Sequence, residues 1–234
     1  KNGETIVFLS DIDEDVTIKQ VANVKFTIDG ANYKYFGTMT VNGTKYAGAQ
    51  GQALTIKNIN FMVDGYGISA NEKSNFARNI TVDGCTFTGT NGTNYDYGMI
   101  LHSVYNVVVK NTTGTNLYDL VYGRGAVDGF TAENVEVINS KNGIWLTYAA
   151  GEITLTNVTS DIVGFKNLGT NGKVTFNNCD IDRIEYSEEG AQSLKFIFND
   201  TENKLTVNED FAHKYLTIVL NNVNTTVEAI EGLK

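Results

Sequence analysis

The chain of 234 residues contains no proline, only two cysteines and fewer basic than acidic residues. At an average usage of about 5%, roughly a dozen prolines would be expected. Proline cannot donate a backbone hydrogen bond and is therefore excluded from central strands of a sheet. Its absence is typical of a fold in which nearly every strand lies between two others.

The chain has too few basic residues to bind a polyanionic partner. The 18 Lys and Arg residues face 27 Asp and Glu residues, which gives a formal net charge of −9. Because phosphate recognition needs clustered basic residues, the composition argues against nucleic-acid binding. The chain also lacks an apolar run of about 20 residues and a signal pattern at its start. We expect no membrane span in this segment, a monomer, and a secreted or cell-surface location with any signal or anchor outside the segment.

A short pattern of apolar, any, apolar, polar, and then Asn, Gly or Asp recurs along the chain. Successive copies begin 28, 26, 27, 23, 23, 21, 22 and 22 residues apart. This period is too short for a strand–helix unit and fits one all-β coil per repeat, which predicts a solenoid. The copies are Phe26–Gly30, Leu54–Asn58, Ile80–Gly84, Val107–Asn111, Phe130–Asn134, Ile153–Asn157, Val174–Asn178, Phe196–Asp200 and Ile218–Asn222.

The last position of each copy is a bend. Gly, Asn and Asp are the residues that most readily take a positive φ. Asparagines stacked at such a bend can hydrogen-bond along their column. We therefore predict an asparagine ladder formed by Asn58, Asn111, Asn134, Asn157, Asn178 and Asn222.

The period near 22, the asparagine column and the short strands resemble the pectate-lyase-like right-handed β-helix superfamily. The chain is also similar to β-helix domains of surface proteins from gut bacteria. The resemblance implies an all-β, single-stranded, right-handed parallel β-helix of about nine or ten coils. We expect one domain over residues 1–234, with an N-terminal capping region (1–23), repeat coils (24–222) and a C-terminal end (223–234).

The repeat places Cys85 and Cys179 at equivalent positions four coils apart. At about 4.8 Å per coil their separation is on the order of 19 Å. A disulfide requires Cα atoms within roughly 7 Å. Both cysteines should therefore be free, buried thiols.

The strand before each bend unit should carry the outer face that forms the substrate groove in the superfamily. Alternation predicts that Met99, Leu101, Ile144 and Leu146 point inward and that Ile100, His102, Trp145 and Thr147 point outward. A slip of one residue would reverse this assignment.

Aromatic residues concentrate in the longest coils and next to them. Extra length in a solenoid goes into surface loops, which often form its binding face. Aromatic rings beside hydrogen-bonding groups suit sugars, although tyrosine is also common in strands for packing reasons. The predicted ligand-binding residues are Trp145, Tyr97, Tyr95, Tyr122, Tyr148, Thr147 and Asn71.

An enzymatic role has weaker support. Without proline the chain cannot carry the Arg-x-Pro-x-x-Arg pattern of pectate lyases, and the Asn-Thr-Asp, Asp-Asp and Gly-His-Gly patterns of polygalacturonases are missing. The remaining catalytic candidates are His102, Arg124, Asp96 and Asp119, because catalysis needs a base and a charge-neutralising cation near one sugar.

Two further patterns point to other binding roles. The acidic run from Asp11 to Asp15 resembles a calcium loop but lacks its glycine and its bidentate glutamate, so we expect no cofactor, with calcium at this run as the minor alternative. Recurring threonines at the second position of the repeat are interrupted by Val108, Ile197 and Val219, which argues against an ice-binding face. The preferred hypothesis is an adhesin-like module that binds a carbohydrate or another host or cell-surface ligand. The alternatives are a polysaccharide lyase or glycoside hydrolase, and a structural stalk.

Overall fold

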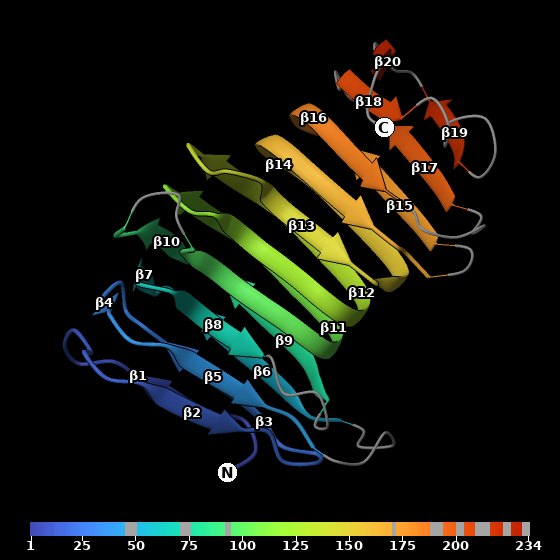
Figure 1. Ribbon diagram of the computed structural model, residues 1–234. Coiled ribbons are helices and arrows are strands. Elements are labelled where there is room, and N and C mark those ends of the chain that lie inside the picture. The colour runs from blue at the N-terminus through green and yellow to red at the C-terminus, as the bar shows by residue number, and fades with distance from the viewer. Residues whose placement is uncertain are drawn as a thin grey trace.

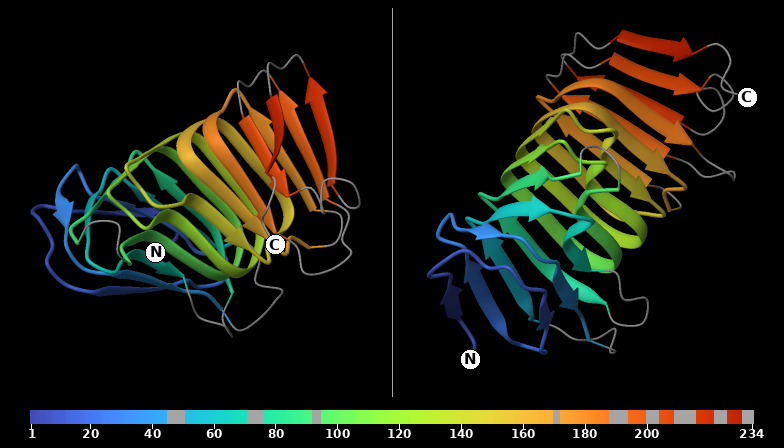
Figure 2. Two further views of the ribbon diagram at one scale, coloured as in Figure 1. Left: turned by 45° about the horizontal axis from the view of Figure 1, so that its top comes forward. Right: turned by 60° about the vertical axis from the view of Figure 1, so that its left-hand side comes forward.

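The computed structural model describes residues 1–44, 51–70, 76–91, 95–169, 172–187, 194–199, 204–208, 216–221 and 226–230. Its strands follow one another along a single axis, from the first strands near the N-terminus to the last near the C-terminus (Figure 1). The two rotated views show the chain winding around that axis, so that strands about two dozen residues apart lie side by side (Figure 2). The molecule is a right-handed parallel β-helix, as the sequence predicts.

The described strands form three parallel sheets. Sheet I stacks, in order, β2 (Val16–Lys19), β5 (Met39–Asn42), β8 (Tyr66–Ala70), the first parts of β11 (Tyr97–Thr115) and β12 (Asp119–Ile138), β13 (Gly143–Thr147), the last parts of β14 (Ala150–Lys166) and β16 (Asp180–Ser187), β18 (Lys204–Asn208) and β20 (Thr226–Ile230). Sheet II stacks β1 (Glu4–Val7), β3 (Lys25–Asp29), β6 (Ala53–Lys57), β9 (Ala77–Asp83), the middle of β11 and β12, the first part of β14, β15 (Gly172–Asn177), β17 (Leu194–Asn199) and β19 (Leu216–Asn221). Sheet III stacks β4 (Lys34–Tyr35), β7 (Asn60–Val63), β10 (Thr86–Gly89), the ends of β11 and β12, the middle of β14 and the start of β16.

The register of sheet II is the one that the repeat predicts. Thr27 pairs with Thr55, and Thr55 pairs with Thr81 in the next coil. The column continues through Val108, Thr131, Thr154, Thr175, Ile197 and Val219. Equivalent positions of the sequence repeat are therefore vertical neighbours in space.

The predicted asparagine ladder is present and continuous over four coils. The side-chain amide of Asn134 donates to Asn111 Oδ1 at 3.1 Å, and Asn157 donates to Asn134 Oδ1 at 2.9 Å. Asn178 donates in turn to Asn157 Oδ1 at 2.9 Å. All four have φ between 48° and 53°, the left-handed conformation predicted for the bend. Asn222 lies outside the described residues.

Where glycine replaces asparagine in this column, an aspartate takes over as acceptor. Asn58 donates to Asp29 Oδ1 at 3.1 Å and Asn111 donates to Asp83 Oδ1 at 2.8 Å, because the preceding bends are Gly30 and Gly84. Hydrogen bonds from the backbone N–H of Ala31 and from Asn58 lower the pKa of Asp29. The early coils thus use charged acceptors for the same column that later coils fill with amides.

Two more corners of the coil also adopt positive φ, which the repeat pattern did not reveal. Asn79 and Asn106 form one such column, in which Asn106 donates to Asn79 Oδ1 at 3.0 Å. Asn116 and Asn139 form another, with a hydrogen bond between their side chains. Each coil therefore turns at several residues that tolerate the left-handed region.

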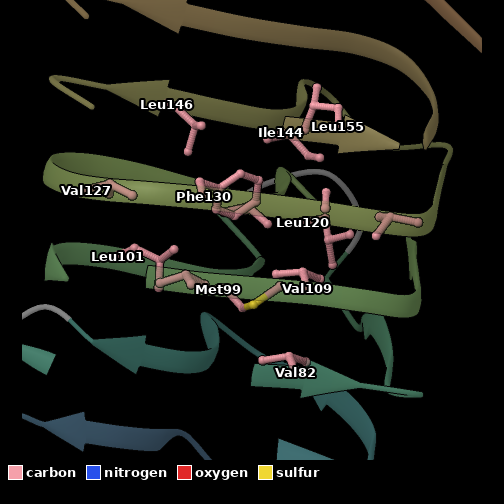
Figure 3. Close-up of a cluster of buried hydrophobic side chains, with 14 of the residues drawn as sticks. Val82, Met99, Leu101, Val109, Leu120, Val127, Phe130, Ile144, Leu146 and Leu155 are labelled. Carbon is pink, nitrogen blue, oxygen red and sulfur yellow. The ribbon is translucent and has the colours of Figure 1, made fainter. Parts of the chain in front are cut away.

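The interior between the three sheets is filled with apolar side chains. Layers of Val, Leu, Ile, Phe and Met from successive coils meet there (Figure 3). Met99, Leu101, Ile144 and Leu146 belong to this core, so the predicted inward assignment is confirmed. Ile100 lies in the outward column beside Tyr122 and is itself buried.

Cys85 and Cys179 are free and buried, as predicted. Burial raises the pKa of the Cys85 thiol to about 12 and that of Cys179 to about 11. Because the thiolate is the reactive form, we expect neither thiol to react with a disulfide reagent in the native protein at about pH 8 or below. Titration with such a reagent should detect two reactive thiols per chain only after denaturant is added. Rapid labelling of the native protein would contradict the buried positions of the two cysteines.

Candidate functional site

A hollow of about 300 Å³ opens on the outer face of sheet I. We call it the aromatic pocket. It is lined by Tyr97, Tyr118, Asp119, Tyr122, Asn142, Trp145 and Glu185. Coil stacking assembles these residues, which come from β11, β12, β13, β16 and the corners between them.

Strand register sets the order of the lining residues. Tyr97 of β11 lies opposite Asp119 of β12, and Tyr122 of β12 lies opposite Trp145 of β13. In the next coils Trp145 is followed by Gly164 and then Glu185 in the same outward column. A Cβ at Gly164 would overlap the indole of Trp145, so the missing side chain leaves room for the ring to lie against the coil.

The tyrosines form a connected aromatic surface around Tyr97. Its ring centroid lies 5.8 Å from Tyr66, 5.2 Å from Tyr118 and 5.4 Å from Tyr122. Lys141 packs against Tyr118 at one edge of this aromatic surface. Its Nζ lies 4.3 Å from the ring centroid of Tyr118 and donates a hydrogen bond to the Tyr118 hydroxyl at 3.0 Å. Burial, followed by the charge of Asp119, raises the pKa of Tyr97 to about 12, so the tyrosine stays neutral at physiological pH.

Asp119 lines the same pocket and is only 1% exposed. Its Oδ1 atom is buried and has no hydrogen-bond partner within the described part of the chain. Burial raises the pKa of the carboxyl group to about 7, although a hydrogen bond from Asn142 and the charge of Lys141 act in the opposite direction. A buried acceptor without a partner is costly and calls for an explanation.

Asp96, another catalytic candidate, has a different environment. Both of its oxygens accept backbone hydrogen bonds, Oδ1 from Gly65 N at 3.0 Å and Oδ2 from Asn91 N at 2.8 Å. The residue is buried. These contacts tie neighbouring coils together and leave the carboxylate occupied.

His102 and Arg124 lie further along the same strands. Leu101 pairs with Gly123 and His102 pairs with Gly125, which makes Arg124 the extra residue of a β-bulge. His102 Nδ1 lies 2.8 Å from Ser103 Oγ, and a Cβ at Gly125 would lie 3.4 Å from His102 Nε2. The two glycines beside Arg124 thus accommodate a bulge and the imidazole ring. Neither His102 nor Arg124 lines the aromatic pocket.

The other predicted binding residues lie at or beyond the rim. Tyr95 is exposed and stacks on Tyr118 with centroids 6.0 Å apart. Thr147 ends β13, and exposed Tyr148 follows it at a corner with a φ of 54°. None of the three lines the pocket, and Asn71 lies outside the described residues. The binding roles of all these residues stay predictions.

Three lining residues are not among the predicted site residues. Tyr118 belongs to the aromatic-rich stretch without standing out in it, and Glu185 has the sequence context of ordinary surface charge. Extending the outward column from Trp145 by two coils reaches Glu185, because the repeat fixes that register. Asn142 precedes Gly143 at a corner, and no sequence pattern marks it as a lining residue.

The spacing of the two pocket carboxylates limits the chemistry. Asp119 and Glu185 belong to coils three steps apart, and Asp119 also lies three residues before the column that contains Glu185, so their backbones are at least about 14 Å apart at about 4.8 Å per coil. Acid and base groups of inverting glycosidases lie roughly 6.5–9.5 Å apart, and those of retaining enzymes are closer. The pair is therefore better placed to hold two points of one extended ligand than to act on a single bond.

No group of three or more His, Cys, Asp or Glu side chains is arranged to hold a metal within the part of the chain that the structure describes. In the acidic run, Asp11 Oδ1 accepts a hydrogen bond from Lys34 N at 2.8 Å and Asp15 Oδ1 accepts one from Thr38 N at 2.7 Å. These two carboxylates stabilise the backbone of the next coil. Likewise, no helix among the described residues is long and apolar enough to cross a membrane.

Comparisons with family models, with curated proteins and with solved structures gave no match.

Proposed function

We propose that the aromatic pocket binds a carbohydrate and that the chain is an adhesin-like β-helix module, secreted or displayed at a cell surface. The observation that carries this proposal is the pocket itself. Trp145 and three tyrosines surround two carboxylates and one amide in a single hollow.

Sugars present apolar C–H faces and polar hydroxyl edges. Aromatic rings with a polar tip match that combination, since the ring covers the C–H face and the polar tip bonds the edge. In the pocket, Trp145 and Tyr122 offer such rings, and Asp119 and Asn142 offer hydrogen-bonding groups. A site of this composition fixes ligand orientation through a few polar groups among apolar walls.

The direction of the column favours an extended ligand. Tyr122, Trp145, Gly164 and Glu185 follow one another parallel to the solenoid axis. Successive positions are about 4.8 Å apart. An oligosaccharide lying along the axis would therefore contact one coil after another.

Hydrolysis of a glycosidic bond is the second candidate function. The observation in its favour is Asp119, whose buried carboxyl group has a pKa raised to about 7, a value that suits a general acid. The three-coil separation from Glu185 is the reason that binding is preferred. Catalysis would require another group near Asp119.

Binding is tested with an oligosaccharide array followed by calorimetry on any hit. We expect the double variant Tyr97→Ala/Trp145→Ala to lose at least about tenfold in affinity, because each truncation costs on the order of 1 kcal/mol or more at the centre of an interface. Tyr33→Ala is the matched control, since that exposed ring lies in an early coil outside the pocket lining.

Both variants should melt within a few degrees of the parent protein. Unchanged affinity in the double variant would disprove the assignment of the pocket, and the absence of any hit on the array would count against carbohydrate binding. Hits should also be incubated with the protein and examined for new reducing or unsaturated ends. A new end that forms only when Asp119 is present would show that the protein is an enzyme and not a binding module.

A further inference from the structure

Among the buried polar atoms of the described residues that lack a hydrogen-bond partner, Asp119 Oδ1 is the one whose residue lines the aromatic pocket. The neighbouring buried carboxylate, Asp96, uses both of its oxygens. Asp119 is equally buried, yet its Oδ1 has no hydrogen-bond partner among the described residues.

We infer that Asp119 determines the specificity of the pocket: its unpartnered oxygen accepts a hydrogen bond from a hydroxyl or ammonium group of the sugar. The pocket therefore takes neutral or amino sugars and rejects uronates. This inference rests on the proposed function and adds the chemical class of the ligand.

Two cations that contact residues lining the pocket already have partners. Lys141 donates to the hydroxyl of Tyr118 at 3.0 Å, and Arg183 pairs with Glu185 at 2.9 Å. Neither lines the pocket, whose lining contains two carboxylates and, among the described residues, no Lys or Arg. The missing partner of Asp119 Oδ1 is thus a donor that the ligand brings.

A uronate would bring the wrong charge to this position. Its carboxylate would approach Asp119 inside a partly desolvated pocket, where like charges repel strongly. A hydroxyl group supplies the missing hydrogen bond without charge, and an ammonium group supplies it with a favourable charge. Selection against uronates follows from the same buried oxygen.

The protonation of Asp119 makes this interaction depend on pH. The titratable groups around it are Tyr97 from β11, Tyr118 and Tyr122 on either side in the chain, Lys141 from the segment before β13, and Glu185 from β16. Asn142 is the uncharged donor. A ligand donor favours the charged carboxylate, so binding should displace the proton. Affinity for a neutral sugar should rise with pH through about 7, where Asp119 ionises, and level off above it.

The experiment measures binding by calorimetry from about pH 5.5 to about pH 8.5. The neutral probes are cellohexaose, xylohexaose and mannohexaose, the amino probe is the hexasaccharide of chitosan, and the acidic probe is hexagalacturonate. For a neutral probe that binds, we expect affinity to increase about tenfold or more over this range, since each pH unit below the pKa reduces the charged fraction about tenfold. Hexagalacturonate should bind at least about tenfold more weakly than that neutral probe at the upper pH.

Asp119→Asn is the informative variant because it keeps the shape and an acceptor oxygen while it removes the titration. We expect its affinity for the neutral probe to be independent of pH and to equal that of the parent at the lower pH. Asp128→Asn removes a carboxylate from the same strand outside the pocket and should retain the pH dependence of the parent. Since burial disfavours the charged form of Asp119, the Asp119→Asn variant should melt at the same or a higher temperature at the upper pH.

The outcomes separate the two proposals. Tight binding of hexagalacturonate, or a pH profile that Asp119→Asn leaves unchanged, would overturn the role of Asp119 and leave carbohydrate binding standing. Failure of every probe to bind would overturn both. A pH dependence lost in Asp119→Asn and kept in Asp128→Asn would establish the inference.

Discussion

Phe130→Ala is expected to lower the free energy of unfolding by about 3–5 kcal/mol, the typical cost of truncating a buried phenylalanine. The ring is 1% exposed and lies in the central coils (Figure 3). Its strand neighbours in the adjacent coils are Val107 and Ile153, which also point into the core. A close-packed interior cannot collapse onto the space left by the ring without moving these coils.

Urea denaturation followed by circular dichroism measures this loss as a lower midpoint. Thr131→Ala is the matched control because Thr131 is the next residue of the same strand and is only half-buried, on the outward face. Its substitution should cost roughly 0.5 kcal/mol or less. Equal effects of the two changes would show that the outward and inward faces of β12 are assigned wrongly.

Asn134→Ala should lower the free energy of unfolding by about 2–4 kcal/mol. The side chain gives one hydrogen bond to Asn111 and receives one from Asn157. The change removes both, at a net cost of about 0.5–1.5 kcal/mol each, because water can bond to the exposed groups that lose their partner. Alanine must also hold the φ of 53°, which costs an ordinary residue roughly 1–2 kcal/mol.

Asn134→Gly separates the two contributions. Glycine accepts the positive φ, so the glycine variant should lose only the hydrogen-bond part and be more stable than the alanine variant. Thermal melting of the three proteins gives the order directly. An alanine variant as stable as the parent would mean that the ladder contributes little, despite its regular geometry.

The fold was predictable because three local patterns agree. Alternating apolar residues mark strands with one buried face, the Asn or Gly after them marks a bend, and the spacing between copies fixes which residues stack. The pairing of Thr55 with Thr81 follows from that spacing alone. The extra corners follow the same spacing, since Asn79 and Asn106 each directly precede the first apolar residue of a copy; the five-residue pattern missed them because it begins one residue later.

The candidate site was predictable only in part. Trp145, Tyr97 and Tyr122 lie in strands whose register follows from the repeat, and the structure brings them together. The environment of each polar group could not be derived in this way. Asp96 and Asp119 look alike in the sequence, yet backbone amides occupy both oxygens of Asp96 and leave one oxygen of Asp119 without a partner. Such differences arise in the corners, where no periodic pattern fixes the path of the chain.

In sheet I, the side chains that determine the chemistry of the outer surface are different from the side chains that stabilise the molecule. The members of the outward column change from hydroxyl groups at Thr40 and Ser69 to aromatic rings at Tyr122 and Trp145, then to Gly164 and Glu185. The side chains that alternate with them continue to fill the same interior. A substitution at one position of this column can therefore change a single surface side chain while the other positions of the column stay as they are. Such a scaffold lets evolution alter recognition one coil at a time, without rebuilding the interior that supports it.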